Sequence, residues 1–317
     1  AVAFGLRGYE VVEAVESLYR DQLRPFGRIL IKRIREQRAE EAAARCGGPL
    51  DVEAIPLIDP GTVRKTCESC ARLAVQPEPG KEYSVLLVDQ VANFVEPTCP
   101  VDVYPPQMWD AAAQYFEEKD VRLPGGRYAC AQALVAMRLP FLQDRSLGEV
   151  CHIVQLSLTY HRLLGYRDGQ MVPFGQSVDC VRAQCAVRQQ PMSAVSKKAE
   201  PELPAATWGQ ARACMWRLLL DAGSRGRPGA VSSSNIKRLF RSRFGLDLSE
   251  TSLGHLRLHE LLQDRRFSDI IMLEMRGSTP LVKPRRQSCW EGEAWLPYTD
   301  GFVMFEQVAE AAPDGWS

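Results

Sequence analysis

The first residues that could carry chemistry are cysteines with the spacing of a metal site or a dithiol. Cys67 and Cys70 are separated by two residues, which suits structural zinc or a redox pair. Zinc would need two further ligands, and residues 1–151 contain no histidine. The pair also lies in a helical pattern rather than at the end of a strand. We therefore expect ordinary cysteines on a helix face.

The four histidines give no clearer sign of a catalytic or metal site. His255 and His259 are four residues apart, but Leu256 follows His255 where the zinc-protease motif has glutamate. His152 and His161 are nine residues apart, which places them on opposite faces of one helix. We find no nucleophile elbow, phosphate-loop fingerprint or carboxylate pair. The prediction is a non-enzymatic protein with no cofactor, no metal and no small-molecule substrate.

Basic residues give the strongest chemical signal, although the chain as a whole is neutral. Lys+Arg and Asp+Glu each number 39. Residues 207–290 hold 15 Lys/Arg against 7 Asp/Glu, a net charge of +8. Residues 291–317 hold 6 Asp/Glu and no Lys/Arg, a net charge of −6. This separation of charge indicates a polyanion site or self-association through the opposed segments.

The elements that must position these residues are helices followed by hairpins. Apolar periodicity predicts helical structure over residues 9–44, with Pro25 at a break or in a first turn, and helices over 147–164 and 235–244, with shorter ones between them. Hydrophobic strand pairs follow helices, with turns near Gly80, Gly169 and Gly277. This order is typical of tandem winged helices, and chance recurrence of a common motif is the alternative. The predicted fold class is mainly α with small β-hairpins (α+β), with a winged helix-turn-helix at the C-terminal side.

Changes in composition divide the chain into five segments. Residues 97–106 are rich in proline, and residues 189–205 are polar and rich in Pro, Ala, Ser and Lys. The predicted segments are a helical, winged-helix-like unit at 1–96, a second helical unit ending in a hairpin at 97–188, a linker at 189–205, a winged helix at 206–286, and an acidic tail at 287–317 with a helix at 300–311.

An apolar pattern in residues 231–284 defines the expected winged helix. A serine-capped helix ends in an aromatic residue, and a turn, a Leu-Gly pair, a Leu-rich helix and a hairpin follow. The matching positions are Ile236, Leu239, Phe240, Phe244, Leu248, Leu253, Gly254, Leu258, Leu261 and Leu262. We expect one helix over 249–264, with its leucines on one face and Gly254 allowing a close approach between helices. The pattern, over residues 206–286, resembles the OST-HTH or LOTUS domain of RNA-regulating proteins.

The expected core leaves the basic side chains of this segment for the surface. The candidate nucleic-acid-binding residues are Lys237, Arg238, Arg241, Arg243, Arg257, Arg265, Arg266, Arg276 and Lys283. A basic face around a helix-turn-helix and its wing suits phosphate contacts, because the guanidinium fork matches phosphate oxygens. A solvated basic face that aids solubility is the alternative.

The resemblance implies RNA binding, with DNA as a second nucleic-acid ligand. It also implies an alternative function: a protein-interaction scaffold that docks a DEAD-box helicase or associates with itself. No apolar stretch approaches the ~20 residues of a transmembrane helix, so we expect no membrane partner. The ten cysteines are dispersed, and several lie in apolar helical patterns. This indicates an intracellular location. The resemblance implies the cytoplasm or a ribonucleoprotein granule, with the nucleus as an open alternative.

Overall fold

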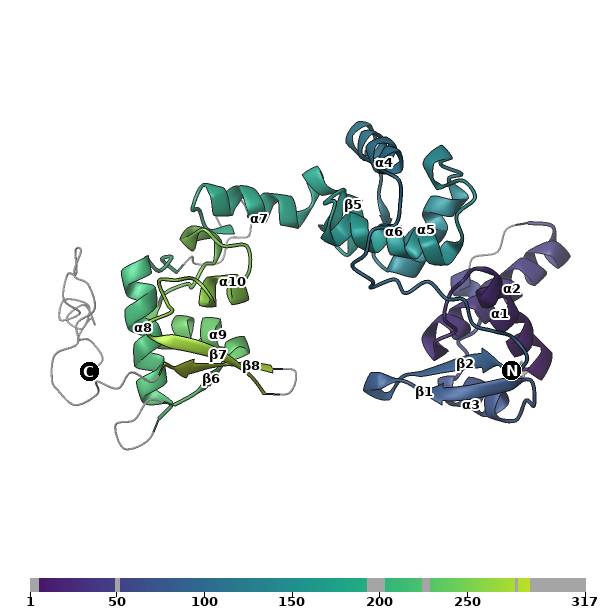
Figure 1. The fold of residues 1–317 in the computed structure, drawn as a ribbon, viewed down its shortest axis with the longest axis horizontal. Coiled ribbons are helices and arrows are strands. Elements are labelled where there is room, and N and C mark those ends of the chain that lie inside the picture. Colours follow the sequence, from purple (N-terminus) through teal and green to yellow (C-terminus); the bar gives the residue numbers. More distant parts are fainter. Residues whose placement is uncertain (1–5, 49–51, 193–202, 224–228, 277–278, 286–317) are drawn as a thin grey trace, which may run out of the picture. The chain divides into compact units, whose positions relative to one another are not determined.

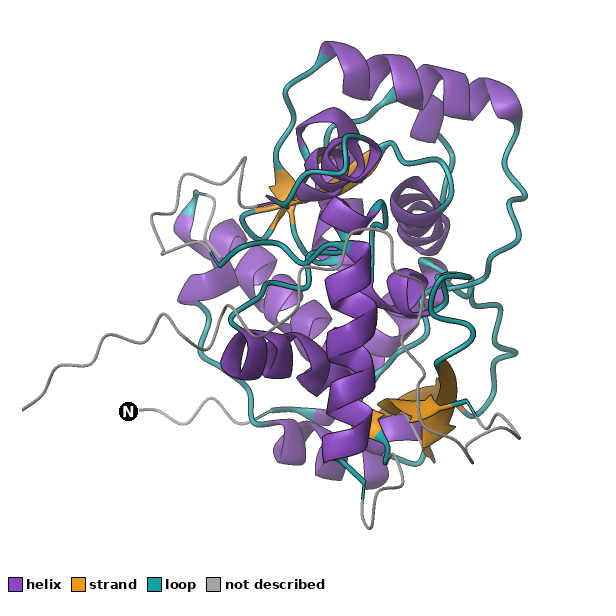
Figure 2. Cartoon of the chain, turned by 90° about the vertical axis from the view of Figure 1, so that its left-hand side faces the viewer, coloured by secondary structure: helices purple, strands orange, loops and turns teal. Residues whose placement is uncertain are grey.

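The computed structural model describes residues 6–48, 52–192, 203–223, 229–276 and 279–285 (Figure 1). The chain divides into two compact units, unit 1 at residues 1–179 and unit 2 at residues 180–317. The predicted acidic tail, with its helix at 300–311, lies outside the described residues. Helices dominate and the strands form small antiparallel sheets, which confirms the predicted fold class (Figure 2).

The first repeat of unit 1 has the element order of a winged helix. Its elements are α1 (Gly8–Arg20), α2 (Gly27–Cys46), a 3₁₀ turn (Val52–Ala54), α3 (Pro60–Glu68), β1 (Leu73–Pro77), a 3₁₀ turn (Pro79–Lys81) and β2 (Tyr83–Leu87). Phe26 bridges to Ser84, at the place of a third strand. The helical run predicted over 9–44 is divided into two helices at the predicted position, because Pro25 lacks an N–H and Gln22 has a φ of 56°. The chain therefore breaks between α1 and α2.

The second repeat of unit 1 has the same order. Its elements are α4 (Pro106–Glu118), β3 (Leu123–Pro124), α5 (Arg127–Ala136), a 3₁₀ turn (Pro140–Leu142), α6 (Leu147–Thr159), β4 (Leu164–Arg167), β5 (Gln170–Pro173) and a 3₁₀ turn (Phe174–Gln176). The sheet order is β3-β5-β4. Asp168 and Gly169 have φ angles of 50° and 77°, as the predicted hairpin turn requires. Helix α7 (Val178–Val187) follows.

The two repeats of unit 1 share a single hydrophobic core. Polar contacts also join them. The guanidinium of Arg33 in α2 is buried, donates to the Tyr128 hydroxyl of α5 at 3.1 Å and pairs with Asp21 at 2.5 Å. The N–H of Gly148, at the start of α6, donates to the Asp21 carbonyl at 2.8 Å. The predicted unit at 1–96 and the predicted unit at 97–188, as far as residue 179, thus belong to one compact body.

Unit 2 contains the third winged-helix order of the described chain. Its elements are α8 (Trp208–Asp221), β6 (Val231–Ser232), α9 (Ser233–Phe244), a 3₁₀ turn (Thr251–Leu253), α10 (Leu258–Leu262), β7 (Ile271–Arg276) and β8 (Thr279–Pro284), with the sheet order β6-β8-β7. The helix predicted over 249–264 is instead split into a 3₁₀ turn and α10. The split occurs at Gly254, whose φ of +82° cannot continue a right-handed helix.

Candidate nucleic-acid interface

The apolar residues of the resemblance form the core of unit 2. Phe240, Leu248, Leu253, Leu261 and Leu262 are buried in one cluster. Phe244 and Leu258 are half-buried and pack against it. Gly254 differs from expectation, since the nearest atom to a Cβ built there is Gln189 Nε2 at 3.9 Å. Its left-handed backbone, and not a close approach of helices, explains the glycine.

The nine candidate cations are distributed over several elements of unit 2. Lys237, Arg238, Arg241 and Arg243 lie on α9, Arg257 precedes α10, Arg265 and Arg266 follow α10, Arg276 ends β7 and Lys283 lies in β8. The hairpin and the two ends of α10 therefore contribute five of these cations, and α9 contributes four.

Four of these cations are already paired with carboxylates inside the unit. The pairs are Lys237–Glu250 at 2.8 Å, Arg241–Asp247 at 2.8 Å, Arg243–Asp221 at 2.6 Å and Lys283–Glu274 at 2.6 Å. A phosphate would have to compete with these carboxylates for the cation. Three of these pairs involve α9 and reduce its positive field, although four of the nine predicted cations lie on that helix.

The other five cations are exposed and make no ion pair with a residue that the structure describes. They are Arg238, Arg257, Arg265, Arg266 and Arg276. Arg238 has a hydrogen bond to the Asn235 side chain at 3.4 Å. A phosphate could therefore approach these guanidinium groups without displacing a carboxylate from an ion pair.

Helix α10 occupies the place of the recognition helix in a helix-turn-helix, but it is short. It has 5 residues, and Leu261 and Leu262 are buried. The Glu260 carboxylate accepts hydrogen bonds from the backbone N–H groups of Leu256 and Arg257. The helix thus presents few side chains that could read base edges.

The arrangement around Arg266, itself a predicted residue, was not foreseen from the sequence, because it joins segments that are far apart in the chain. Arg266 lies 4.4 Å from the ring centroid of Trp208, at the start of α8. Arg212, also on α8, donates to both carboxylate oxygens of Asp269, at 2.7 and 2.6 Å. This hydrogen bonding lowers the pKa of Asp269. The one signal for this arrangement in the sequence was Trp208, an aromatic residue four positions before Arg212.

The recognition position of the second repeat in unit 1 is covered. Of the 13 residues of α6, Thr159 is the one that is exposed. His152 contacts the Tyr104 hydroxyl through Nδ1 at 3.0 Å and the Cys99 carbonyl through Nε2 at 2.9 Å. The segment before α4 therefore covers one side of α6, and the α1–α2 loop contacts its first turn.

The remaining histidine and cysteine candidates have structural surroundings. His161 stacks on Trp109 with a centroid distance of 3.7 Å, and its Nε2 is 2.8 Å from Asp102. Burial raises the pKa of the Cys67 thiol to about 12, which disfavours the thiolate. In the described ranges, no group of three or more His, Cys, Asp or Glu side chains could hold a metal ion.

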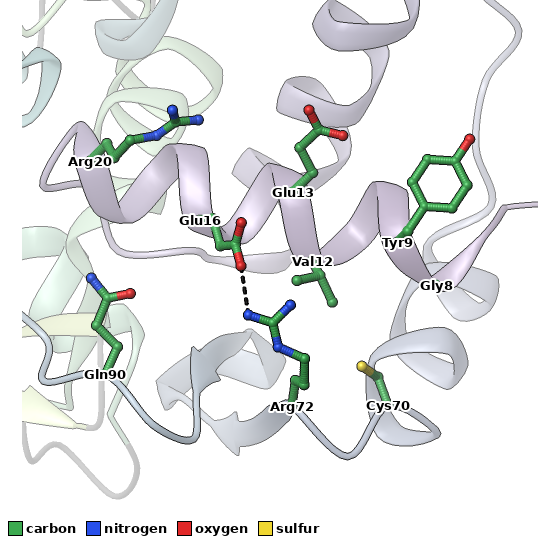
Figure 3. Close-up of a pocket in the computed structure, with 9 residues that line it drawn as sticks. All are labelled: Gly8, Tyr9, Val12, Glu13, Glu16, Arg20, Cys70, Arg72 and Gln90. Carbon is green, nitrogen blue, oxygen red and sulfur yellow. Dashed lines mark hydrogen bonds and ion pairs between the residues drawn. The ribbon is translucent and has the colours of Figure 1, made fainter.

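A groove of about 830 Å³ runs along α1 in unit 1 (Figure 3). Its charged lining residues are Glu13, Glu16, Arg20 and Arg72, and Arg72 pairs with Glu16 at 2.7 Å. The opposed charges balance, so this groove does not attract polyanions. Among the described helices, none has the length and apolar character needed to cross a bilayer.

Comparison with known families places one further segment. Neither the curated proteins nor the solved structures gave a match. Residues 117–186 match the model of the OST-HTH Associated domain. The match begins at the end of α4 and extends into α7, and so covers most of the second repeat. The chain therefore carries, at residues 117–186, a segment that matches the OST-HTH Associated domain, consistent with the OST-HTH resemblance of residues 206–286.

Proposed function

We propose that this chain is a non-enzymatic RNA-binding protein that contacts RNA through the winged helix of unit 2. The observation that carries the proposal is the set of five exposed cations without ion pairs described above. Three of them, Arg257, Arg265 and Arg276, flank α10 and end β7, which are the places where a helix-turn-helix and its wing meet a phosphate backbone.

Two further observations support RNA as the ligand. The segment 207–290 has a net charge of +8, which favours a polyanion. The match of residues 117–186 concerns a domain associated with OST-HTH proteins, which are RNA-related. The short α10 also supports RNA over duplex DNA, because major-groove readout needs a helix with several exposed side chains.

A protein-interaction scaffold is the second candidate function, and the burial of α6 favours it. A winged helix with a covered recognition helix cannot insert that helix into a nucleic-acid groove. In this function unit 1 docks a protein, with a DEAD-box helicase or a second copy of the chain as the proposed partner. The two candidates are compatible, since they use different units.

The RNA proposal is tested by the salt dependence of binding to a fluorescent single-stranded RNA. The variant Arg257→Ala/Arg265→Ala/Arg276→Ala removes three unpaired cations. Each phosphate contact contributes about −0.7 to the slope of log K against log salt concentration. We expect the slope to become less negative by about 2, with weaker binding at every salt concentration.

The matched control is Arg45→Ala/Arg64→Ala/Arg72→Ala, which removes the same charge from exposed, paired side chains of unit 1. It should leave the slope unchanged. Equal slopes for the two triple variants would contradict the placement of the interface. If the wild-type chain shows no salt-dependent RNA binding, the RNA proposal is refuted and the scaffold function is the remaining candidate. Sedimentation would test self-association, and titration with a purified helicase would test helicase binding.

A further inference from the structure

The platform at the start of α8 has the composition of a stacking site. Trp208 lies 5.6 Å from the ring of Phe267, which is fully buried, and 6.0 Å from the ring of His255. These contacts fix the indole in place. The guanidinium of Arg266 lies over the indole ring at 4.4 Å and is exposed to solvent. A planar cation is thus held above an aromatic ring at the surface.

The backbone of Arg266 is fixed on both sides. Its N–H donates to the Asp264 carboxylate at 2.7 Å, and its carbonyl accepts a hydrogen bond from the Arg212 guanidinium. Arg212 is itself held by two hydrogen bonds to Asp269. The position of Arg266 is therefore set before any ligand arrives, which reduces the entropy lost on binding.

The same loop carries one more arginine and contacts another. Ser268 donates through its hydroxyl to the Arg265 carbonyl at 2.6 Å, and its own carbonyl accepts a hydrogen bond from Arg285, which follows β8. The loop between α10 and β7 thus carries Arg265 and Arg266, and the Arg285 guanidinium is bonded to its backbone. Asp269 is paired with Arg212 and Asp264 with His255 at 2.8 Å. Among the described residues, no ion pair joins either carboxylate to these three arginines, although Asp264 is close enough to Arg266 to interact with its charge.

We propose that Arg266, supported by Trp208, stacks on an unpaired RNA base, and that Arg265 and Arg285 contact the phosphates beside it. The proposal rests on the proposed RNA binding and assigns its ligand class, single-stranded RNA with an accessible base. Bases in single strands stack on aromatic rings and on guanidinium planes, whereas bases in an A-form duplex are stacked on one another. Because α10 is short and presents few side chains, the Trp208–Arg266 platform is better suited than α10 to contact bases in unit 2.

The test uses the full chain and the variant Arg266→Lys, which keeps the positive charge but removes the planar guanidinium group. Affinity is measured for a short unstructured RNA and for an abasic ribose-phosphate oligomer of the same length. We expect binding to the RNA to weaken about tenfold, equivalent to ~1.4 kcal/mol, and binding to the abasic oligomer to stay unchanged. Trp208→Leu, with its fold checked by thermal melting, should give the same pattern.

The matched control is Arg217→Lys, the same exchange at an exposed arginine of α8 that pairs with Asp221 and has no place in the proposed interface. It should change neither affinity. If Arg266→Lys behaves like this control while the wild type binds RNA, the stacking site is refuted and the proposed function stands. If both ligands lose the same affinity, Arg266 contacts phosphate and not a base, which also overturns the inference. If the wild-type chain binds no RNA, the proposed RNA-binding function and the stacking site are both refuted.

Discussion

The substitution Gly148→Ala tests how the two repeats of unit 1 are joined. Gly148 lies in the first turn of α6, where its N–H donates to the Asp21 carbonyl. A Cβ at this position would lie 2.6 Å from the Gln22 carbonyl oxygen and 2.9 Å from that of Asp21. Both neighbours are backbone atoms of the α1–α2 loop, so no side-chain rotation can make room. The loop and α6 must move apart.

The expected cost follows from these distances. Ordinary contact begins at 3.4 Å, so the separation must grow by about 0.8 Å. Overpacking of this kind costs roughly 1–3 kcal/mol. The stretched hydrogen bond to Asp21 loses up to about 1 kcal/mol. Alanine recovers less than about 1 kcal/mol through its better helix propensity, because the position is in the first turn. We expect a net loss of about 2 kcal/mol.

Urea unfolding followed by circular dichroism measures this loss, and hydrogen exchange of the α6 amides assigns it to unit 1. The control is Gly8→Ala, at the first residue of α1, where a Cβ meets no atom within 4 Å. This variant should be neutral or slightly stabilised. Equal free energies of unfolding for the two variants would refute the reasoning, because they would mean that the close approach of α6 to the α1–α2 loop does not constrain how the two repeats pack.

Two further predictions concern unit 2. Gly254→Ala should lose roughly 1–2 kcal/mol of stability through its positive φ, and Gly254→Asn should lose less; equal losses in urea unfolding would point to crowding instead of φ. The hydrogen bond from Arg212 lowers the pKa of Asp269, so this pair stabilises the fold above about pH 4, and its contribution is lost as the pH falls through the folded-state pKa. Asp269→Asn should therefore show a shallower loss of stability in acid, and an unchanged acid-unfolding profile would contradict this account.

Much of the fold could be predicted from local patterns. Helix α6 begins at Ser146 with the Ser-x-x-Glu capping box, and the Asp168–Gly169 turn closes its hairpin. Both depend on neighbouring residues and are visible in any sequence window. The break before α2 could be predicted from Pro25, whereas the break at Gly254 within the helix predicted over 249–264 was missed. There, one backbone angle overrides an apolar stripe that continues across it.

The site was less predictable than the fold. The type and number of basic residues on the surface of unit 2 follow from composition. Whether each one is free depends on which carboxylate lies next to it in space. Asp221 on α8 neutralises Arg243 on α9, and no periodicity in either helix indicates that pair. The Trp208–Arg266 platform joins residues 58 positions apart for the same reason.

The sequence by itself determined the mainly helical class, the recurring helix-and-hairpin order, the charge separation and the apolar pattern of the third repeat, because these depend on residue types at short spacing. Tertiary structure alone decided which cations remain unpaired, that α6 is buried, and that Arg266 lies over the indole of Trp208 while Arg212 and Arg285 bond to the backbone of the α10–β7 loop. Ion pairing, burial and stacking depend on distances between segments, and those distances exist only once the chain has folded.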